Sequence, residues 1–567
     1  MSAVRSPMRK SVVLVFSFFL LSFLAATVCR ADNPVPAKPV EAAKGMVASA
    51  HPLATAVGVE ILKRGGNAVD AAVATAFALG VVEPNASGLG GGGFIMFYNA
   101  KTKKVEVIDY REIAPFKATP DMYKLTPDRK VVDKATTIGH RAVAVPGTLA
   151  GLDMALKRWG TMKLKDVMAP AIRIAEEGYT VSATFNGMMK DNFDKLTKFP
   201  EAAKIYLKNG LPYEVGDKIV LKDLAKTYRL IAGKGPSVFY KGEIADALVK
   251  EMEAGGGLIS KADLALYRPT LREPIRGTYR GYEIISMPSP SSGGTHIIQI
   301  LNILEGYDMA KMGQNTAAAI HMMAEAMKCA FADRAKYSAD TDFAWVPTKG
   351  LLSKEYAADI RTRIAGDVVS RKVPAGNPWS YQSGGTSHSS YVDKDGNMVA
   401  LTQTINLFFG SGVVIPGYGV MLNDEMDDFV PVPGNANSIQ PRKKPLSSMS
   451  PSIVLKEGKP FLSFGSPGAT RILTALPQIF MNIVDHGMDL QQAINAPRIH
   501  CMTGEIFMES RIPKDVQEAL KAKGHKVSVR GAMDLYFGGA QGVMVDAKTG
   551  KLYGGADPRR DGFAAGY

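Results

Sequence analysis

The chain has 567 residues, 46% of them hydrophobic and 22% charged, a globular composition that excludes a disordered, collagen-like or coiled-coil protein. Its three cysteines exclude a disulfide framework, and their spacing offers no CxxC pair for zinc. The formal net charge is +14, but the Lys and Arg residues are scattered rather than gathered into a basic stripe or a known nucleic-acid module. We therefore expect no nucleic-acid partner.

The N-terminus predicts export. Arg9 and Lys10 precede an uncharged apolar stretch over 11–28, and small residues follow around Cys29 and Ala31. This order is typical of a secretory signal peptide. An uncleaved anchor is the alternative, because about 18 apolar residues is the lower limit for a membrane span. We expect residues 1–31 to be a signal peptide and the protein to be periplasmic or secreted.

The first half of the chain predicts two helices and a hairpin, followed by a helical region. Apolar residues at helical spacing predict two helices over 53–82, separated at Gly65-Gly66-Asn67. The glycine run 88–93 then opens into a β-hairpin that turns at 100–104 and ends at Arg111. Residues from about 140 to 380 are expected to be mostly helical, including a helix over 317–336.

A second sheet-rich region begins at Thr386. If Gly396 takes the left-handed position of a three-residue loop, Thr386 pairs with Thr404; a two-residue loop would pair it with Ile405. A further hairpin is predicted with its turn at Glu457-Gly458. The order of the predicted elements is helices, strands, helices and then strands and helices again. This order suggests sheets packed between helical layers rather than alternating βαβ units. Cys329 and Cys501 could pair or stay free.

Most standard site motifs are absent. Gly88-x-Gly90-x-x-Gly93 matches the dinucleotide fingerprint in form but precedes a strand, so it lacks the helix N-terminus that holds a pyrophosphate. The sequence contains no P-loop, no HExxH and no GxSxG, and its eight histidines show no ligand spacing. We therefore expect no cofactor and no metal.

A threonine carries the remaining chemistry. Thr386 follows Gly384-Gly385 at the head of a predicted strand, and glycine leaves its carbonyl open to attack by the next residue's hydroxyl. Such an attack turns the peptide bond into an ester that water then hydrolyses. The new chain end combines a hydroxyl with an α-amine of reference pKa about 7.7–8.0, which can act as its general base.

Long stretches of the sequence resemble the γ-glutamyltranspeptidases (glutathione hydrolases). The matching blocks follow the family's order: HPLATAVGVEILKRGGNAVDAAVATAFALGVVEPNASGLGGGGFIM, DYREIAP, AVPGTLAGL, MPSPSSGG, AFADRAKY, TSHSSYVDKDGN, LNDEMDDF, PLSSMSP, GSPGATRI and DPRRDGFAAGY. The resemblance implies an α+β fold, a four-layer αββα sandwich of the N-terminal-nucleophile hydrolase type. It also implies a precursor that cleaves itself between Gly385 and Thr386 into a large subunit, 32–385, and a small catalytic subunit, 386–567, which stay together.

The resemblance assigns the catalytic residues. Thr386 matches the nucleophile that holds the γ-glutamyl group as an ester, and Thr404 matches a second threonine that orients it. Gly468 and Ala469 fall where the family has a Gly-Gly pair whose N–H groups stabilise the oxyanion. The alanine departs from that pattern, and its methyl group implies a tighter site.

The resemblance also assigns a binding site for a zwitterion. Arg111 matches the arginine that clamps the substrate α-carboxylate, and Ser447 and Ser448 match the serine pair that binds the same group. Asp428 matches the acid that receives the α-ammonium, at the opposite end of the pocket from Arg111. Asn406 and Glu425 are its expected helpers.

The implied function is γ-glutamyl transfer and glutathione hydrolysis, with glutathione or other γ-glutamyl compounds as donors and water, amino acids or peptides as acceptors. Fifteen residues separate Phe429 from Pro445, fewer than in family members with a lid, so we expect an open pocket. A cephalosporin or glutaryl acylase on the same scaffold is the alternative. A secreted binding protein without activity is a third possibility, against which the intact Thr386, Thr404 and glycine loop argue.

Overall fold

The computed structural model describes residues 35–370, 373 and 386–567. The predicted signal peptide and Gly385 lie outside the described residues. Pro36–Tyr567 forms one unit by its internal contacts.

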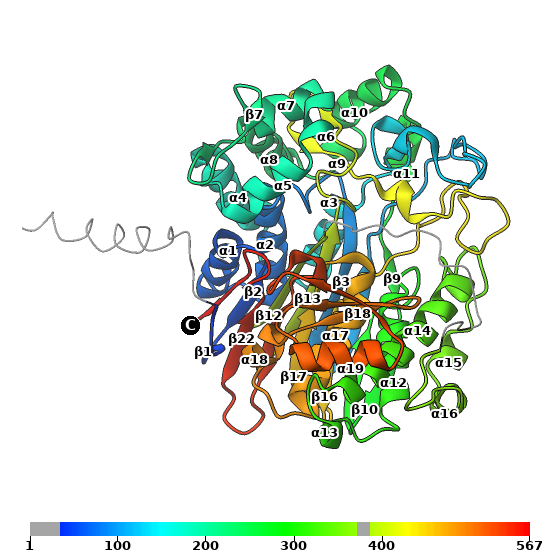
Figure 1. Ribbon diagram of the computed structural model, residues 1–567. Helices are drawn as coiled ribbons and strands as arrows, with labels where there is room; N and C mark the ends of the chain where they lie inside the picture. Colours follow the sequence, from blue (N-terminus) through cyan, green and yellow to red (C-terminus); the bar gives the residue numbers. More distant parts are fainter. Residues whose placement is uncertain (1–34, 371–372, 374–385) are drawn as a thin grey trace, which may run out of the picture. The chain divides into compact units, whose positions relative to one another are not determined.

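Thr386 begins the central strand pair of a seven-stranded antiparallel sheet with the order β23-β2-β12-β13-β3-β4-β9 (Figure 1). Its strands are β2 (Met46–Ser49), β3 (Gly92–Asn99), β4 (Lys104–Asp109), β9 (Thr270–Arg272), β12 (Thr386–Val392), β13 (Met398–Thr404) and β23 (Phe563–Gly566). Every residue of β12 and β13 is buried. The nucleophile candidate therefore starts a strand in the middle of the fold.

A second seven-stranded antiparallel sheet has the order β1-β22-β21-β17-β16-β11-β10. Its strands are β1 (Val40–Ala42), β10 (Ile275–Tyr279), β11 (Tyr282–Ser286), β16 (Ser452–Lys456), β17 (Lys459–Gly465), β21 (Gln541–Val545) and β22 (Leu552–Ala556). Apolar side chains of the two sheets face each other in one buried cluster, among them Phe94, Met96 and Met398 of the first sheet and Ile453 and Val543 of the second. The two sheets thus form a sandwich.

Helices cover both outer faces of the sandwich (Figure 1). On the first sheet lie α1 (Pro52–Lys63), α2 (Ala68–Val82) and α3 (Thr148–Trp159), with α4 (Leu164–Glu177) and α8 (Lys222–Lys234) packed around them. On the second sheet lie α12 (Gly293–Leu304), α14 (Ala317–Tyr337), α17 (Ile472–Val484) and α18 (Leu490–Asn495). This arrangement confirms the α+β, four-layer αββα expectation.

Shorter elements complete the described chain. The further helices are α5 (Ala183–Asp191), α6 (Phe193–Lys198), α7 (Pro200–Tyr206), α9 (Ser237–Tyr240), α10 (Glu243–Ala254), α11 (Lys261–Leu266), α13 (Met309–Met312), α15 (Thr348–Leu351), α16 (Lys354–Thr362) and α19 (Lys514–Ala522). The further strands are β5 (Tyr179–Thr180), β6 (Leu207–Lys208), β7 (Leu211–Pro212), β8 (Lys218–Ile219), β14 (Val414–Ile415), β15 (Val420–Met421), β18 (Ile499–Cys501), β19 (Glu505–Glu509) and β20 (Lys526–Arg530).

The predicted positions of helix starts and hairpin turns are confirmed where capping or turn residues determine them. Asn67 caps α2 in a capping box with Asp70, which is why the helices break there. Gly396 has a φ of +80°, and Thr386 faces Thr404 in the register, so the three-residue loop is confirmed. The expectation that 140–380 is mostly helical missed the strands β5 to β11. Of these, β9, β10 and β11 join the two large sheets by pairing with β4 or β16 or with each other.

Cys329 and Cys501 are both buried free thiols, so they do not pair with each other. In the part of the chain that the structure describes, no helix combines the length and the apolar character that a membrane crossing requires.

Candidate active site

Thr386 lies in a buried polar site at the start of β12. Its hydroxyl oxygen is 3.4 Å from that of Thr404, and its side chain is 4% exposed. Side chains two residues apart in a strand share a face, and His388 packs against Gly465 of the second sheet. Thr386 therefore lies on the face of the first sheet that is turned toward β17 and the loop after it.

Asn406 holds Thr404 in place and connects the two threonines to the acidic segment that follows β15. The Asn406 backbone N–H donates to Thr404 Oγ1 over 2.7 Å, and the Asn406 side-chain amide donates to the carbonyl of Asp424 over 3.1 Å. The backbone at Asn406 is left-handed, with a φ of +70°, a conformation that asparagine tolerates better than most residues. Asn406 thus joins the nucleophile pair to the start of the segment that carries Glu425 and Asp428.

The candidate oxyanion loop lies between β17 and α17. Gly468 has a φ of +126° and Ala469 a φ of +51°, so both positions lie in the left-handed region that favours glycine. The short 3-10 helix Ala469–Arg471 leads directly into α17. Backbone N–H groups that precede a helix gain from its dipole when they bind an anion. Ala469 adopts the backbone conformation of a glycine although it carries a methyl group.

A cleft of about 900 Å³ opens beside this loop. Gly468, Phe408, Asp427, Pro431, Arg471 and Tyr536 are among the residues that line it. The segment between Phe429 and Pro445 packs against the protein through the buried Ile439 and through backbone bonds of Arg442 and Lys443 to Ala114. Within the segment, the Lys443 ammonium donates to the carbonyls of Ala436 and Ser438. These contacts support the expectation of an open pocket.

The glycine run 88–93 serves close packing under the site. A Cβ at Gly91 would overlap the carbonyl oxygen of Thr404, and one at Gly92 would overlap the carboxylate of Glu112. Only glycine allows the backbone to come this near to both. The structure thus explains the fingerprint-like spacing without a bound nucleotide.

Arg111 is the centre of a buried ionic cluster. The residue is 1% exposed, and its guanidinium pairs with Glu425, with Asp428 at 2.5 Å and with Glu112 at 3.6 Å. It also donates to the carbonyls of Pro445 and Leu446. The expectation that Arg111 and Asp428 lie at opposite ends of the pocket is therefore wrong: the two side chains contact each other directly, because the buried guanidinium takes the nearest carboxylates as counter-ions.

Three carboxyl groups surround this one cation, and burial raises the pKa of two of them, Glu112 and Glu425. Burial raises the pKa of Glu112 to about 7 although Arg111 pulls it down, and it raises the pKa of Glu425 well above its ordinary value. Asp428 is the most exposed of the three, with 30% of its side chain accessible. Asp428 is thus the carboxylate that a substrate ammonium reaches most easily.

The serine pair lies next to a second arginine that the sequence reasoning did not single out. Ser447 Oγ accepts from the Met449 N–H over 3.1 Å, whereas Ser448 Oγ accepts from Arg334 over 3.0 Å. Arg334 also donates to Ser292 Oγ and interacts electrostatically with Asp428. It stands in the last turn of α14, within the block AFADRAKY, but only the tertiary packing shows that this turn reaches the serines.

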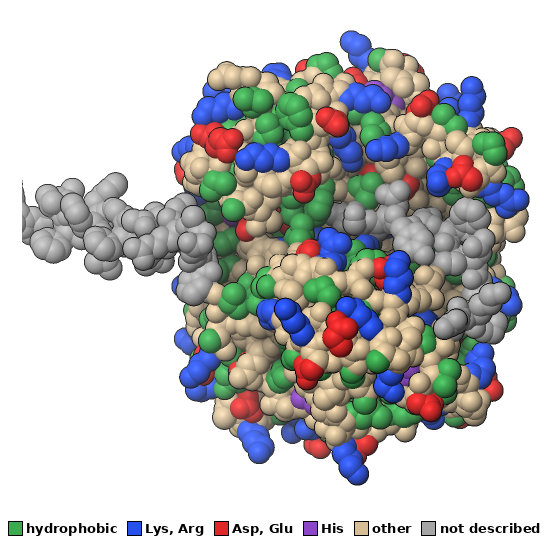
Figure 2. Space-filling model, viewed as in Figure 1, with side chains coloured by type: hydrophobic (Ala, Val, Ile, Leu, Met, Phe, Trp, Pro, Cys, Tyr) green, Lys and Arg blue, Asp and Glu red, His purple; other side chains and the backbone are tan. Residues whose placement is uncertain are grey.

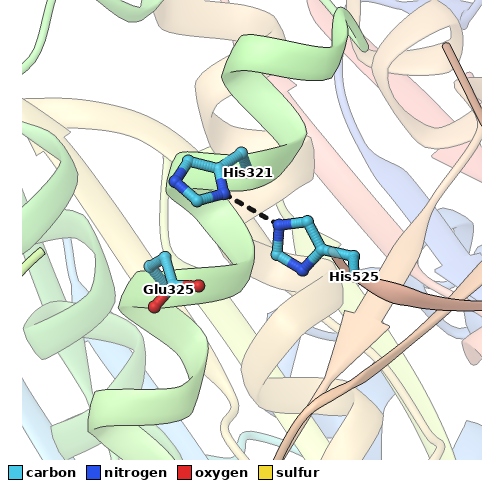
Figure 3. A group of neighbouring side chains, drawn as sticks. All are labelled: His321, Glu325 and His525. Carbon is cyan, nitrogen blue, oxygen red and sulfur yellow. Dashed lines mark hydrogen bonds between the residues drawn. The ribbon is translucent and has the colours of Figure 1, made fainter. Parts of the chain in front are cut away.

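A separate group, His321, Glu325 and His525, has the side chains of a cation site (Figure 3). One ligand atom from each lies within 4.8 Å of the others, a proximity that the sequence spacing did not indicate. The two imidazoles share a hydrogen bond of 2.8 Å, and the Lys328 ammonium lies 2.5 Å from the Glu325 carboxylate. Because a buried cation already balances the single carboxylate, we assign no ion to this group.

Basic and acidic side chains are interspersed over the face visible in Figure 2. That distribution matches the scattered Lys and Arg of the sequence, which carries no basic stripe.

Comparison with known proteins shows which family the chain resembles over its length. A family model described as "Gamma-glutamyltranspeptidase" matches residues 54–567. The chain is 46% identical to the glutathione hydrolase proenzyme of Escherichia coli (strain K12) over 93% of both chains. It is 44% identical to the acylase ACY 1 proenzyme of Pseudomonas sp. (strain SE83), over 94% of this chain and 95% of that one.

The fold has a close counterpart among solved structures. A cephalosporin acylase from Bacillus halodurans superposes with a TM-score of 0.86 at 32% identity, over 95% of this chain and 99% of that chain. Names of both kinds, hydrolase and acylase, therefore occur among the similar proteins.

Proposed function

This chain belongs to the gamma-glutamyltranspeptidase family, and on that premise we propose that it is a γ-glutamyl transferase and glutathione hydrolase. Thr386 takes the γ-glutamyl group from glutathione or another γ-glutamyl compound and passes it to water, an amino acid or a peptide. The observation that carries this proposal is the pairing of the Thr386 and Thr404 hydroxyls, 3.4 Å apart. Asn406 links Thr404 to Asp424, the residue before Glu425.

The first step is self-cleavage between Gly385 and Thr386, although Gly385 lies outside the described residues. Thr386 Oγ1 attacks the Gly385 carbonyl carbon, the C–N bond breaks, and the amide becomes an ester with the amine released on Thr386. Water then hydrolyses the ester, which leaves a carboxylate on Gly385 and returns the proton to the hydroxyl. The products are a large subunit, 32–385, and a small subunit, 386–567.

The sheet order explains why the two subunits would stay together. In the first sheet, strands of both subunits are interleaved: β2 of the large subunit lies between β23 and β12 of the small one, and β13 of the small subunit pairs with β3 of the large one. β2 is paired on both sides with strands of the small subunit, β12 and β23. Separation would break several strand pairings of a buried sheet, so cleavage changes the covalent chain but not the packing.

The cut creates the catalytic base. The new α-amine of Thr386 takes the proton from Oγ1 as Oγ1 attacks the γ-carbonyl. The backbone N–H groups of Gly468 and Ala469 stabilise the resulting oxyanion, each contribution being about 2.7–4 kcal/mol in comparable sites. The amine passes its proton to the leaving amine, and the γ-glutamyl ester remains on Thr386. Water or an acceptor amine then attacks the ester and releases the product.

The ionic cluster supplies the recognition. The substrate α-carboxylate binds Arg111 and the serines, while its α-ammonium binds Asp428. The two charges of the substrate thus replace the ion pair between Arg111 and Asp428. Glu425, with its raised pKa, and Asn406 support Asp428. An acyl group that lacks either charge leaves one of these groups unpaired, which a binding site of this kind rejects strongly.

An acylase acting on cephalosporin or glutaryl substrates is the second candidate, because some of the similar proteins carry acylase names. The presence of Arg111, Asp428 and the serine pair in one cluster favours the γ-glutamyl reading. We also propose export, for which the basic and apolar N-terminus of the sequence is the support.

The proposed function is tested by denaturing gel electrophoresis and a γ-glutamyl anilide assay on the purified protein. Two fragments with anilide hydrolysis are expected. A single chain without hydrolysis would contradict the proposal.

A further inference from the structure

One edge of the nucleophile strand is closed by a side chain instead of a strand. β2 pairs with β12 only over Ser389–Val392, since the chain leaves β2 after Ser49 to begin α1. Among the residues that the structure describes, Thr386 therefore pairs with β13 on one side and with no strand on the other. On that side Arg560 Nη1 donates to the Thr386 carbonyl oxygen over 2.7 Å, and Arg560 is 5% exposed.

The turn that carries Arg560 is held firmly. It precedes β23, and its charged side chains bond to buried or half-buried partners elsewhere in the chain. These bonds are Asp557 to Arg498 at 2.7 Å, Arg559 to Glu509 at 2.6 Å, and Asp561 to Ser182 at 2.5 Å and to Thr184 at 2.8 Å. The guanidinium of Arg560 thus approaches Thr386 from a backbone fixed by its neighbours, as a pre-organised site requires.

Glu83 is the counter-ion of Arg560. This residue ends α2, is 8% exposed and lies 3.6 Å from the Arg560 guanidinium. Ser387, the residue after the nucleophile, faces Glu83 from β12, and Asp561 faces it from the turn before β23. Neither Glu83 nor Arg560 has a role in the chemistry described above, although Arg560 bonds to the carbonyl of Thr386 and Glu83 faces the side chain of the next residue, Ser387.

We infer that Arg560 and Glu83 form a positioning pair for the nucleophile: Arg560 holds the Thr386 carbonyl and thereby the direction of its hydroxyl and amine, and Glu83 holds Arg560. This inference rests on the proposed role of Thr386 and adds two residues to it. The same pair would also affect self-cleavage, because the Thr386 hydroxyl must be oriented toward Gly385 before it can react with a substrate.

The pair also gives the site a dependence on pH. Burial raises the pKa of Glu83 to about 7, and this effect outweighs the attraction of Arg560. Asp561 also faces Glu83 and raises its pKa further. Next to Asp561 lies His51, whose pKa burial lowers to about 4, so it carries no charge near neutral pH. As the pH falls through 7, Glu83 takes up a proton and Arg560 loses its counter-charge. The positioning pair therefore works fully only above neutral pH.

The test compares Arg560→Lys and Glu83→Gln with the wild type in the rate of self-cleavage and in kcat and KM for a γ-glutamyl anilide. Lysine keeps the charge but not the planar fork. The loss of a charge-assisted hydrogen bond lowers a rate constant by about 10- to 150-fold. We expect this fall in kcat and in the rate of self-cleavage, whereas KM should change by less than about threefold. The matched controls are Arg276→Lys and Glu283→Gln, an exposed pair at 2.7 Å on β10 and β11.

The pH profile separates positioning from simple structural support. In the wild type, kcat should fall at acidic pH more steeply than one proton allows, since both Glu83 and the Thr386 amine gain protons. In Glu83→Gln, the fall of kcat at acidic pH should have the slope expected for the uptake of one proton. Unchanged kcat and cleavage in both variants, or an identical acid limb in Glu83→Gln, would overturn the inference while leaving the proposed function intact. If the wild type cleaves itself but has no γ-glutamyl activity, the proposed function fails and the cleavage rates still decide on Arg560 and Glu83.

Discussion

Thr386 and Thr404 face each other across adjacent antiparallel strands, and their hydroxyl oxygens lie 3.4 Å apart in a continuous chain. The second hydroxyl is thus beside the first before any peptide bond is cut. Because Asn406 donates to Thr404 Oγ1, the position of Thr404 does not depend on the α-amine that cleavage would release. The geometry suits both reactions proposed for Thr386.

Replacing Thr404 tests this pairing. Thr404→Val keeps the shape but removes the hydroxyl, and an ordinary hydrogen bond corresponds to roughly a tenfold loss. We expect kcat for a γ-glutamyl anilide to fall by about that factor and self-cleavage to slow. Thr404→Ser is the matched control and should stay close to wild type. Equal rates for the valine and serine variants would show that the hydroxyl does not orient Thr386.

Replacing Arg111 tests the carboxylate clamp. Arg111→Lys keeps a positive charge among Glu112, Glu425 and Asp428 but cannot reproduce a bidentate fork. A charged hydrogen bond is worth about 1.5–3 kcal/mol, so kcat/KM for a γ-glutamyl substrate should fall by about 10- to 150-fold. Arg158→Lys, whose guanidinium pairs with Glu106 at the surface, is the control. An unchanged kcat/KM would mean that Arg111 does not bind the carboxylate.

The left-handed backbone of the oxyanion loop predicts opposite effects at two neighbouring positions. Ala469 has a φ of +51°, which costs an L-residue roughly 1–2 kcal/mol, so Ala469→Gly should raise the free energy of unfolding by about 1 kcal/mol. Gly468→Ala should lower it, since the φ there is +126° and the new Cβ would lie 3.1 Å from Gly538. Urea unfolding of both variants measures the difference. A destabilised Ala469→Gly variant would contradict this account of the loop.

Replacing Thr386 tests self-cleavage. Thr386→Ala should remain one chain without activity, because no hydroxyl attacks Gly385, whereas Thr386→Ser should still be cut. N-terminal sequencing of the small wild-type fragment should begin at Thr386. Any other first residue would refute the assignment of the nucleophile.

Local turn chemistry made part of the fold predictable from the sequence. Gly396 with its positive φ fixed the hairpin register that places Thr404 opposite Thr386, and Asn67 marked the start of α2. The hairpin of β10 and β11 escaped prediction because β16, the strand that joins it to the sheet through β11, lies far away in the chain. The four layers followed from the family resemblance, since the order of helices and strands indicated only sheets between helices.

For the site, only the residues that lie in family motifs could be predicted from the sequence. Those motifs named Arg111 and Asp428 but not their direct contact, which arises because a buried guanidinium needs counter-charges at once. Arg334 and Arg560 were missed for a different reason. Each reaches the site from a distant part of the chain, and nothing in the neighbouring sequence shows that Arg334 meets Ser448 or that Arg560 meets Thr386.

The central claim is that this site accepts a γ-glutamyl group and rejects an acyl group without the α-amine. The direct measurement is a pair of kcat/KM values on the cleaved enzyme, one for a γ-glutamyl anilide and one for the glutaryl anilide, which lacks only the α-amine. Without the ammonium, Asp428 is left without a substrate partner, and rejection of this kind can reach about 10⁴-fold. We predict a preference above about 10³-fold for the γ-glutamyl compound. Comparable rates would contradict the zwitterion site and favour the acylase alternative.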